Sequence, residues 1–200
     1  LMIDTNHAYG VGDAIRLGHA LADHDLRWYE EPVAPEHIQG YREVRSRVSM
    51  PVAGGENEHT LYGFRDFLGA VAVDIAQPDL GSVGGFTAAR HVITLAQAHG
   101  AQVNPHVWGS AIAQAASLQL IAAVPVAHHS VFAEEPIFEY DRSSHPFRQM
   151  LVREPAILNE ASRRRLAELL ASNQQLKTVH DFRDRLKLLW AGAHQRHDAM

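Results

Sequence analysis

Short apolar runs alternate along the chain with longer stretches whose apolar residues recur at helical spacing. The short runs predict strands at residues 1–4, 26–29, 51–53, 71–76 and 102–104, and a last strand between residues 130 and 140. The longer stretches predict helices around residues 14–21, 38–48, 62–68, 86–99 and 112–123. Glycine and proline mark the joins. Strand–helix alternation of this kind favours parallel βα units.

Beyond Pro155 the pattern changes. Residues 162–172 and 179–190 have the apolar spacing of helices, and no strand or glycine-rich turn is visible there. The pattern therefore divides the chain into a βα domain over residues 1–155 and a helical tail over residues 156–200.

Ionisable residues stand at or just after the ends of the predicted strands. They recur at intervals of 23 to 27 residues, as Asp4, Glu30, Glu56, Asp79 and His106. In a (β/α)8 barrel such strand ends all meet on one face, where the active site is built, whereas in an open doubly wound sheet they would not all converge. The fold prediction is therefore α/β, a partial (β/α)8 TIM barrel of about six of the eight βα units, followed by the helical tail.

Composition narrows the classes of protein. The 200 residues are 46% hydrophobic and 20% charged, which is ordinary for a globular domain. A net charge of −5 disfavours nucleic acid and anionic membranes as partners. The absence of cysteine excludes disulfides, thiolate catalysis and cysteine-built zinc sites. No apolar stretch is long enough for a membrane helix and no signal segment opens the chain, so a cytoplasmic location is expected.

Three carboxylates that converge would repel one another unless a cation lies between them. Asp4, Glu30 and Glu56 offer only hard oxygen ligands, which suit Mg2+, or alternatively Mn2+, rather than zinc. For each residue alone, a solvated loop carboxylate or a helix N-cap is the favoured interpretation. The shared spacing favours the metal hypothesis for the three together.

His106 follows Pro105 at a predicted strand end, and Asp79 stands one strand earlier. A carboxylate beside an imidazole orients the ring and raises its basicity, as a general base requires. The chain has 14 histidines, and a structural role is the alternative for each of them. The position of His106 favours the catalytic interpretation.

An ordered set of motifs resembles the barrel domain of the enolase superfamily, in the mandelate racemase/muconate lactonizing enzyme group, over about residues 1–155. The motifs are Ile3-Asp4-Thr5-Asn6, Trp28-Tyr29-Glu30-Glu31-Pro32, Pro51-Val52-Ala53-Gly54-Gly55-Glu56, Gln77-Pro78-Asp79 with Gly84-Gly85, and Pro105-His106-Val107-Trp108-Gly109. Residues 135–141 and 145–148 further resemble the galactarolactone cycloisomerase and sugar-acid dehydratase branch.

The resemblance implies roles for particular residues. Asp4, Glu30 and Glu56 match the Mg2+ ligands. His106 matches the general base and Asp79 its dyad partner. The other matched residues concern the substrate: Glu139 would hydrogen-bond its carboxylate in the enolate form, and Asn6, His7 and Trp108 would lie near it. His7 is either a proton donor to the leaving group or a plain loop residue, and the resemblance assigns no role to Glu31, Asn57 or Glu58.

The implied reaction is Mg2+-dependent abstraction of a proton α to a carboxylate, followed by β-elimination. The substrate would be a small sugar acid or its lactone, and elimination would mean dehydration or lactone opening. Racemisation or epimerisation is the alternative within the same family. A homo-oligomer is expected for the full-length parent.

The chain also departs from the family pattern. It has no Lys-x-Lys motif, no part of it resembles the capping domain with which family members begin, and its sequence after Pro155 does not match. The apolar start at Leu1-Met2-Ile3 resembles the middle of a buried strand. These features predict a fragment or truncated product, and they keep open the hypothesis of a catalytically inactive remnant.

Overall fold

The structure, a computed structural model, describes residues 1–125, 136–140 and 146. Within these residues five strands form one parallel sheet in chain order, β1-β2-β3-β4-β5. The strands are β1 (Ile3–Asp4), β2 (Tyr29–Glu30), β3 (Val52–Gly54), β4 (Ile75–Ala76) and β5 (Gln102–Val103). Their register aligns the functional ends, because Asp4 lies opposite Glu30 and Glu30 lies opposite Ala53.

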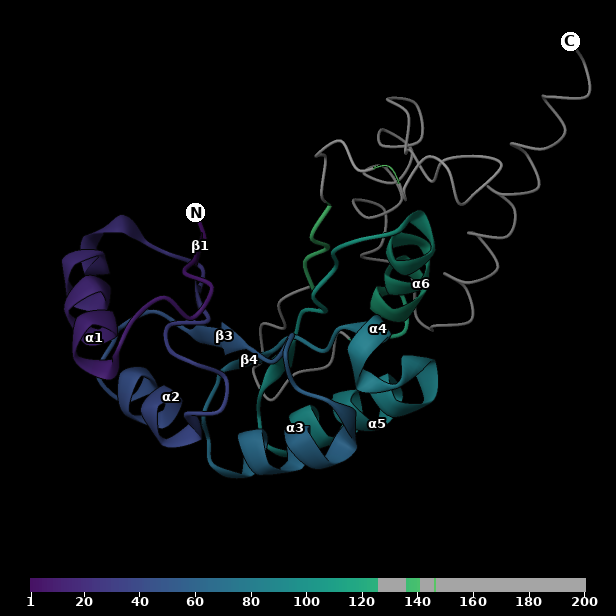
Figure 1. Cartoon of the computed structure of the whole chain (residues 1–200), viewed down its shortest axis with the longest axis horizontal. Coiled ribbons are helices and arrows are strands. Elements are labelled where there is room, and N and C mark those ends of the chain that lie inside the picture. The colour runs from purple at the N-terminus through teal and green to yellow at the C-terminus, as the bar shows by residue number, and fades with distance from the viewer. Residues whose placement is uncertain (126–135, 141–145, 147–200) are drawn as a thin grey trace, which may run out of the picture.

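A helix follows each strand, and the helices lie in an arc around the outside of the strands (Figure 1). They are α1 (Val11–Ala20), α2 (Ile38–Arg45), α3 (Thr60–Gly69), α4 (Leu80–Val83), α5 (Gly85–Ala98) and α6 (Ala111–Ile121), with a 3-10 turn at Ala22–His24. Among the described residues, no helix combines the length and the apolar character required to cross a membrane.

The core lies between the strands and the helices. Tyr29 and Val52 of the strands are fully buried, as are Tyr41 of α2 and Phe64 of α3. The rings of Tyr41 and Phe67 meet edge to face, with centroids 5.0 Å apart. This apolar layer fixes the helices against the sheet and leaves the carboxyl ends of the strands to carry polar residues.

The predicted parallel order of the first five strands, with helices between them, is confirmed. The short helix α4 was not expected. It forms because Asp79 caps its first turn, accepting hydrogen bonds from the backbone N–H groups of Gly81 and Ser82. The predicted last strand is not seen where the structure describes it, since residues 136–140 have no regular secondary structure. Residues 130–135 and the predicted helices of the tail lie outside the described residues.

Candidate active site

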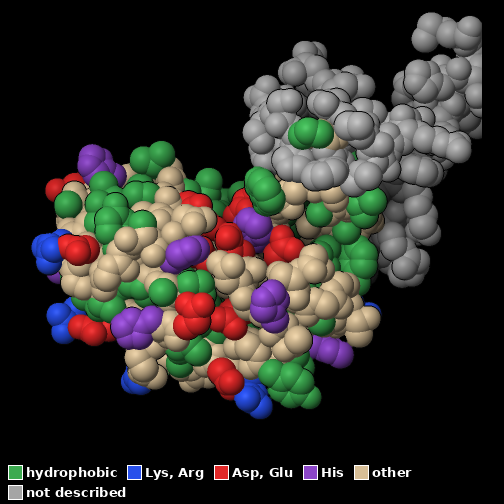
Figure 2. All heavy atoms as spheres, in the orientation of Figure 1, with side chains coloured by type: hydrophobic (Ala, Val, Ile, Leu, Met, Phe, Trp, Pro, Cys, Tyr) green, Lys and Arg blue, Asp and Glu red, His purple; other side chains and the backbone are tan. Residues whose placement is uncertain are grey.

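Residues from four strand ends meet in one cavity of about 700 Å3, a size typical of small-molecule sites. Asp4 and Glu30 are the last residues of β1 and β2, while Glu56 and His106 follow β3 and β5 by two and three residues. The complete lining is Met2, Asp4, Asn6, Trp28, Glu30, Glu56, His106, Val107, Trp108, Glu139 and Tyr140. In Figure 2, acidic side chains (red) and histidine side chains (purple) gather in the middle of the face of the molecule that is shown.

The loops after β1 and β2 hold each other in an unusual conformation. Asn6, His7 and Glu31 all have positive φ angles, of 43°, 49° and 42°. The backbone N–H of His7 donates to the Glu31 carbonyl at 2.7 Å, and Thr5 Oγ1 donates to the carbonyls of both Glu30 and Glu31. Strained backbone of this kind clusters at functional sites, where the surrounding contacts enforce it.

The turn after β3 depends on glycine. Gly55 has a φ of +121°, and a Cβ there would lie 2.9 Å from the Phe64 ring. Only glycine adopts this conformation without strain, and only glycine allows α3 to pack this closely. The turn directs Glu56 into the cavity.

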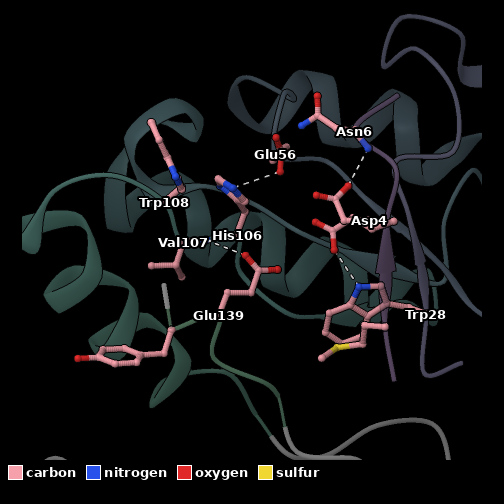
Figure 3. Close-up of a pocket in the computed structure, with 11 residues that line it drawn as sticks. Asp4, Asn6, Trp28, Glu56, His106, Val107, Trp108 and Glu139 are labelled. Atoms are coloured by element: carbon pink, nitrogen blue, oxygen red, sulfur yellow. Dashed lines mark hydrogen bonds and ion pairs between the residues drawn. The ribbon is translucent and has the colours of Figure 1, made fainter. Parts of the chain in front are cut away.

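Asp79 and His106 form a hydrogen-bonded pair. The two oxygens of Asp79 have separate partners: Oδ1 accepts from the Gly81 N–H at 2.6 Å, and Oδ2 lies 2.8 Å from His106 Nδ1. Because the carboxylate accepts, Nδ1 carries the proton, and Nε2 is the nitrogen turned toward Glu56 Oε2, 3.2 Å away. Figure 3 shows this imidazole at the cavity wall opposite Asp4.

The charges around His106 set its basicity. Burial would lower its pKa, but the hydrogen bond to Asp79 and the negative charges of Glu56 and Glu139 outweigh burial and raise the pKa to about 9. Burial likewise opposes the ionised form of Asp79, yet its hydrogen bonds from His106 and Gly81 leave its pKa lowered. At neutral pH and without a cation nearby, the pair therefore consists of an ionised carboxylate and an imidazole that is protonated on both nitrogens.

The cavity carboxylates disfavour one another's charge. Burial raises the pKa of Glu56 to about 7. The nearby positive charge of His106 opposes this effect, whereas the negative charges of Glu31, Glu30 and Asp4 add to it. Burial and the repulsion from Asp4 also raise the pKa of Glu30, although hydrogen bonds from Gln77 and Trp28 oppose them. This clustered negative charge is suited to a cation.

The chemistry of these donors fits Mg2+, because Asp4, Glu30 and Glu56 present only carboxylate oxygens. As placed, no three acidic or histidine side chains among the described residues lie close enough to hold an ion together. A carboxylate has about four acceptor positions. The hydrogen bonds from Asn6 N to Asp4 and from Trp28 Nε1 to Glu30 therefore leave capacity for a metal.

Glu139 reaches the cavity from a segment far along the chain. Its Oε2 accepts from the backbone N–H of Val107 at 3.1 Å, and its Oε1 accepts from Gln77 Nε2 at 3.3 Å. The segment is anchored because Ile137 N donates to Asn104 Oδ1 at 2.7 Å. Burial, followed by the charge of Glu30 and opposed by His106, raises the pKa of Glu139 to about 7.

The residues that the resemblance placed near the substrate divide into two groups. Asn6 and Trp108 line the cavity, and the Trp108 side chain is 61% exposed beside it. His7 is not part of the lining. Its Nδ1 lies 3.1 Å from Glu31 Oε2, and Glu31 also accepts from Asn57 Nδ2 at 2.9 Å.

Sequence reasoning missed two residues that touch the cavity carboxylates. Trp28 donates from Nε1 to Glu30 Oε2 at 2.8 Å, and Gln77 donates to Glu139. Both lie inside recognised motifs, but their apolar or neutral character points as readily to the core as to a site. Only the position of their donor groups shows which carboxylates they orient.

These features define an α/β protein whose site lies at the carboxyl ends of adjacent parallel strands. The model of the family described as enolase C-terminal domain-like matches residues 1–160, and the chain belongs to this family. The resemblance to the enolase superfamily is thereby confirmed.

Curated relatives specify the branch. The chain is similar to the D-galactarolactone cycloisomerase of Agrobacterium fabrum, at 48% identity over 155 residues, which cover 78% of this chain and 41% of that protein. It is also similar to the L-rhamnonate dehydratase of Saccharopolyspora erythraea, at 46% identity over 53% of this chain and 28% of that protein. The chain thus spans less than half the length of these relatives.

Solved structures agree with the fold. The 3,6-anhydro-D-galactonate cycloisomerase from Zobellia galactanivorans aligns with a TM-score of 0.66 and 39% identity, covering 72% of this chain and 39% of that one. A racemase from Streptomyces coelicolor A3(2), solved with bound magnesium, aligns with a TM-score of 0.52 and 39% identity over 53% of this chain and 32% of that one.

Proposed function

We propose that this chain carries the catalytic barrel segment of a Mg2+-dependent enzyme that removes a proton α to a carboxylate and then eliminates a β-substituent. The substrate is a small sugar acid or its lactone. The observation that carries the proposal is the His106–Asp79 pair facing a cluster of carboxylates in one cavity. The similarity to sugar-acid cycloisomerases and dehydratases supports the choice of substrate class.

Asp4, Glu30 and Glu56 are the residues that would hold the metal in this proposal. When bound, Mg2+ would stabilise the negative charge that develops on the substrate carboxylate as the α-proton leaves. The similar racemase with bound magnesium supports this assignment. Side-chain rotation within the cavity is needed to bring the three carboxylates onto one ion.

In this mechanism His106 acts as the base through Nε2 in its neutral form, which a cation held by Glu56 would favour by offsetting the negative charge that raises the pKa of His106. Asp79 holds Nδ1–H and so keeps the basic nitrogen directed into the cavity. The proton moves from the α-carbon to Nε2, and the electrons of the C–H bond form the enolate. Glu139, which lines the same cavity, hydrogen-bonds the substrate carboxylate in this form.

Collapse of the enolate completes the elimination. The electron pair forms a Cα–Cβ double bond while the β C–O bond breaks, releasing hydroxide from an acid or opening the ring of a lactone. Protonated His106 or a water donates a proton to the leaving group. His7 is not chosen as this donor, because its ring contacts Glu31 and lies outside the cavity lining. Asn6 and Trp108 contact the substrate from the rim.

Elimination is preferred to racemisation for two reasons. A one-base elimination needs only His106, whereas a two-base racemisation needs a second base on the opposite side. Among the described residues that line the cavity, His106 is the one imidazole and there is no lysine. The names of the similar cycloisomerase and dehydratase point in the same direction.

The proposal also extends to the architecture. The five described βα units form part of a (β/α)8 barrel. The arc of helices outside the parallel strands and the similarity to the Zobellia cycloisomerase support this assignment.

The test is turnover of a panel of sugar acids and lactones in the presence of Mg2+. The chain is assayed by itself and as a hybrid in which it replaces the matched segment of the Agrobacterium cycloisomerase. We expect the hybrid to turn over at least one substrate, and His106→Asn to reduce its kcat by about 10²-fold or more. The matched control is His99→Asn, which changes an exposed histidine at the end of α5.

Unchanged turnover in His106→Asn would mean that the assigned base is wrong. Activity that persists when Mg2+ is removed by chelation would refute the metal-dependent mechanism. A folded hybrid that turns over none of the panel would instead support the inactive remnant.

A further inference from the structure

Gln77 is the most deeply buried polar side chain beside the cavity. It follows β4 directly, has no exposed surface, and its backbone N–H donates to the Gly54 carbonyl at 2.9 Å. The side chain therefore starts from a fixed point between β3 and β4, behind the carboxylates that line the cavity.

The side-chain amide of Gln77 interacts with two carboxylates. Nε2 donates to Glu139 Oε1 at 3.3 Å. The same amide also acts on the Glu30 carboxyl group, whose pKa it lowers against the larger, opposite effect of burial. These two carboxylates come from positions more than 100 residues apart in sequence, and both line the cavity.

The carbonyl end of the same amide is left unsatisfied. Gln77 Oε1 is buried and has no hydrogen-bond partner among the described residues. The reversed amide would place this oxygen against carboxylate oxygens, which would be repulsive. Only one orientation is therefore compatible with the two carboxylates, and it leaves a buried acceptor unpaired, which is unfavourable for folding. An apolar side chain of the same length would fill the space without this penalty, but it could not donate to Glu139.

We propose that Gln77 is a positioning residue that ties the carboxylates of Glu30 and Glu139 together through its side-chain amide. This inference rests on the proposed function, in which Glu30 binds the metal and Glu139 binds the substrate carboxylate. Holding Glu30 and Glu139 together sets the distance between the residue that binds the metal and the residue that binds the substrate carboxylate, on which negative charge develops. Glu139 is also held by the Val107 N–H, so both of its oxygens are fixed.

The direct test is nuclear magnetic resonance of the 200-residue chain without metal. The Gln77 side-chain NH2 signal is identified by its loss in Gln77→Met, which keeps the length of the side chain and removes the donors. We expect this signal to shift in Glu139→Gln and also in Glu30→Gln. The side-chain signal of Gln114, a buried glutamine of α6 outside the cavity lining, serves as the control and should stay in place.

The functional test measures Mg2+ binding by calorimetry and turnover in the hybrid. Gln77→Met is expected to weaken Mg2+ binding and to lower kcat by about tenfold each, as loss of a residue that orients a metal ligand does. In the Gln77→Met background, Glu139→Gln should no longer alter Mg2+ affinity. Gln77→Glu, which also keeps the length and loses the donors, gives a second variant, and Gln114→Met is the matched control for loss of a buried amide.

The outcomes separate the two proposals. If the Gln77 side-chain NH2 signal does not shift in either glutamate variant, the positioning role is overturned, whatever the Mg2+ binding data show. Wild-type Mg2+ affinity and kcat in both Gln77 variants overturn it as well. Absence of Mg2+ binding in the wild-type chain and the hybrid instead contradicts the proposed function, and the amide signals still decide whether Gln77 ties the two carboxylates.

Discussion

At the scale of single residues, the site depends on how each side chain divides its hydrogen bonds. Asp79 uses Oδ1 to cap α4 and Oδ2 to hold His106 Nδ1, so one residue fixes both a helix and a ring. Without the second bond the imidazole could present either nitrogen to the cavity. The choice of the ring nitrogen that acts as the base thus depends on a carboxylate that need not touch the substrate.

Asp79→Asn tests this division directly. Asparagine is as good an N-cap as aspartate, so α4 is expected to remain. With Oδ1 still bound to the Gly81 N–H, the amide Nδ2 would face His106 and donate to Nδ1. The proton of the neutral ring would then lie on Nε2, which cannot act as a base, and kcat of the hybrid should fall by about 10²-fold or more.

The control for this variant is Asp66→Asn on the exposed surface of α3, where Asp66 bonds to Arg65. It should leave turnover unchanged. Circular dichroism spectra of both variants should match the wild type. Wild-type kcat in Asp79→Asn would show that Asp79 does not orient the base.

At the scale of the elements, turns between strand and helix aim the functional side chains. The sheet places the strand ends side by side, but the residues after each end decide where a side chain points. Gly55 is the clearest case, because its φ of +121° and its close approach to Phe64 exclude other residues. The packing of α3 against the sheet and the direction of Glu56 are therefore set by the same glycine.

Gly55→Ala should affect both stability and the site. We expect the free energy of unfolding to fall by about 1–3 kcal/mol because of backbone strain, with additional crowding against Phe64. Mg2+ binding should weaken as well, since the turn carries Glu56. Gly69→Ala at the end of α3 is the control, because a Cβ there meets nothing within 4 Å. Chemical denaturation and calorimetry measure the two effects, and equal behaviour of the two variants would contradict the role of this turn.

At the scale of the whole molecule, the cavity concentrates negative charge on one face. Asp4, Glu30, Glu56 and Glu139 line it together with a single histidine, His106. Burial and mutual repulsion make this arrangement unfavourable for folding in the absence of a cation. A ligand that binds only the folded state would offset that penalty.

Mg2+ is therefore expected to stabilise the chain. At a concentration of about 100 times Kd, the free energy of unfolding should rise by about 2.7 kcal/mol, observed as a higher Tm in calorimetry. Glu56→Gln should remove most of this increase. In a chelating buffer the same variant should melt higher than the wild type, because it lacks one of the repelling carboxylates.

Sodium chloride at matched ionic strength is the control for simple screening. A Tm that responds equally to Na+ and Mg2+ would contradict a specific site. A Glu56→Gln variant that keeps the full Mg2+ effect would show that Glu56 is not a ligand.

The order and parallel arrangement of the first five strands could be predicted from the sequence, because apolar periodicity and glycine or proline joins are local signals. The sequence also identified the strand-end residues, since Asp4, Glu30, Glu56, Asp79 and His106 recur at nearly equal intervals. Because the interval between them repeats, such residues can be recognised before the structure is known. The domain division at residue 155, the helical tail and the roles assigned to the site residues stay predictions.

The contacts between side chains became known from the folded structure. It brought Glu139 to Val107 and Gln77, directed Trp28 Nε1 at Glu30, and turned His7 toward Glu31. The sequence could not show these contacts, because they join residues from different units and depend on the orientation of single donor atoms. The spacing along the chain gives the strand from which a side chain comes, whereas packing and backbone turns decide the direction in which it points.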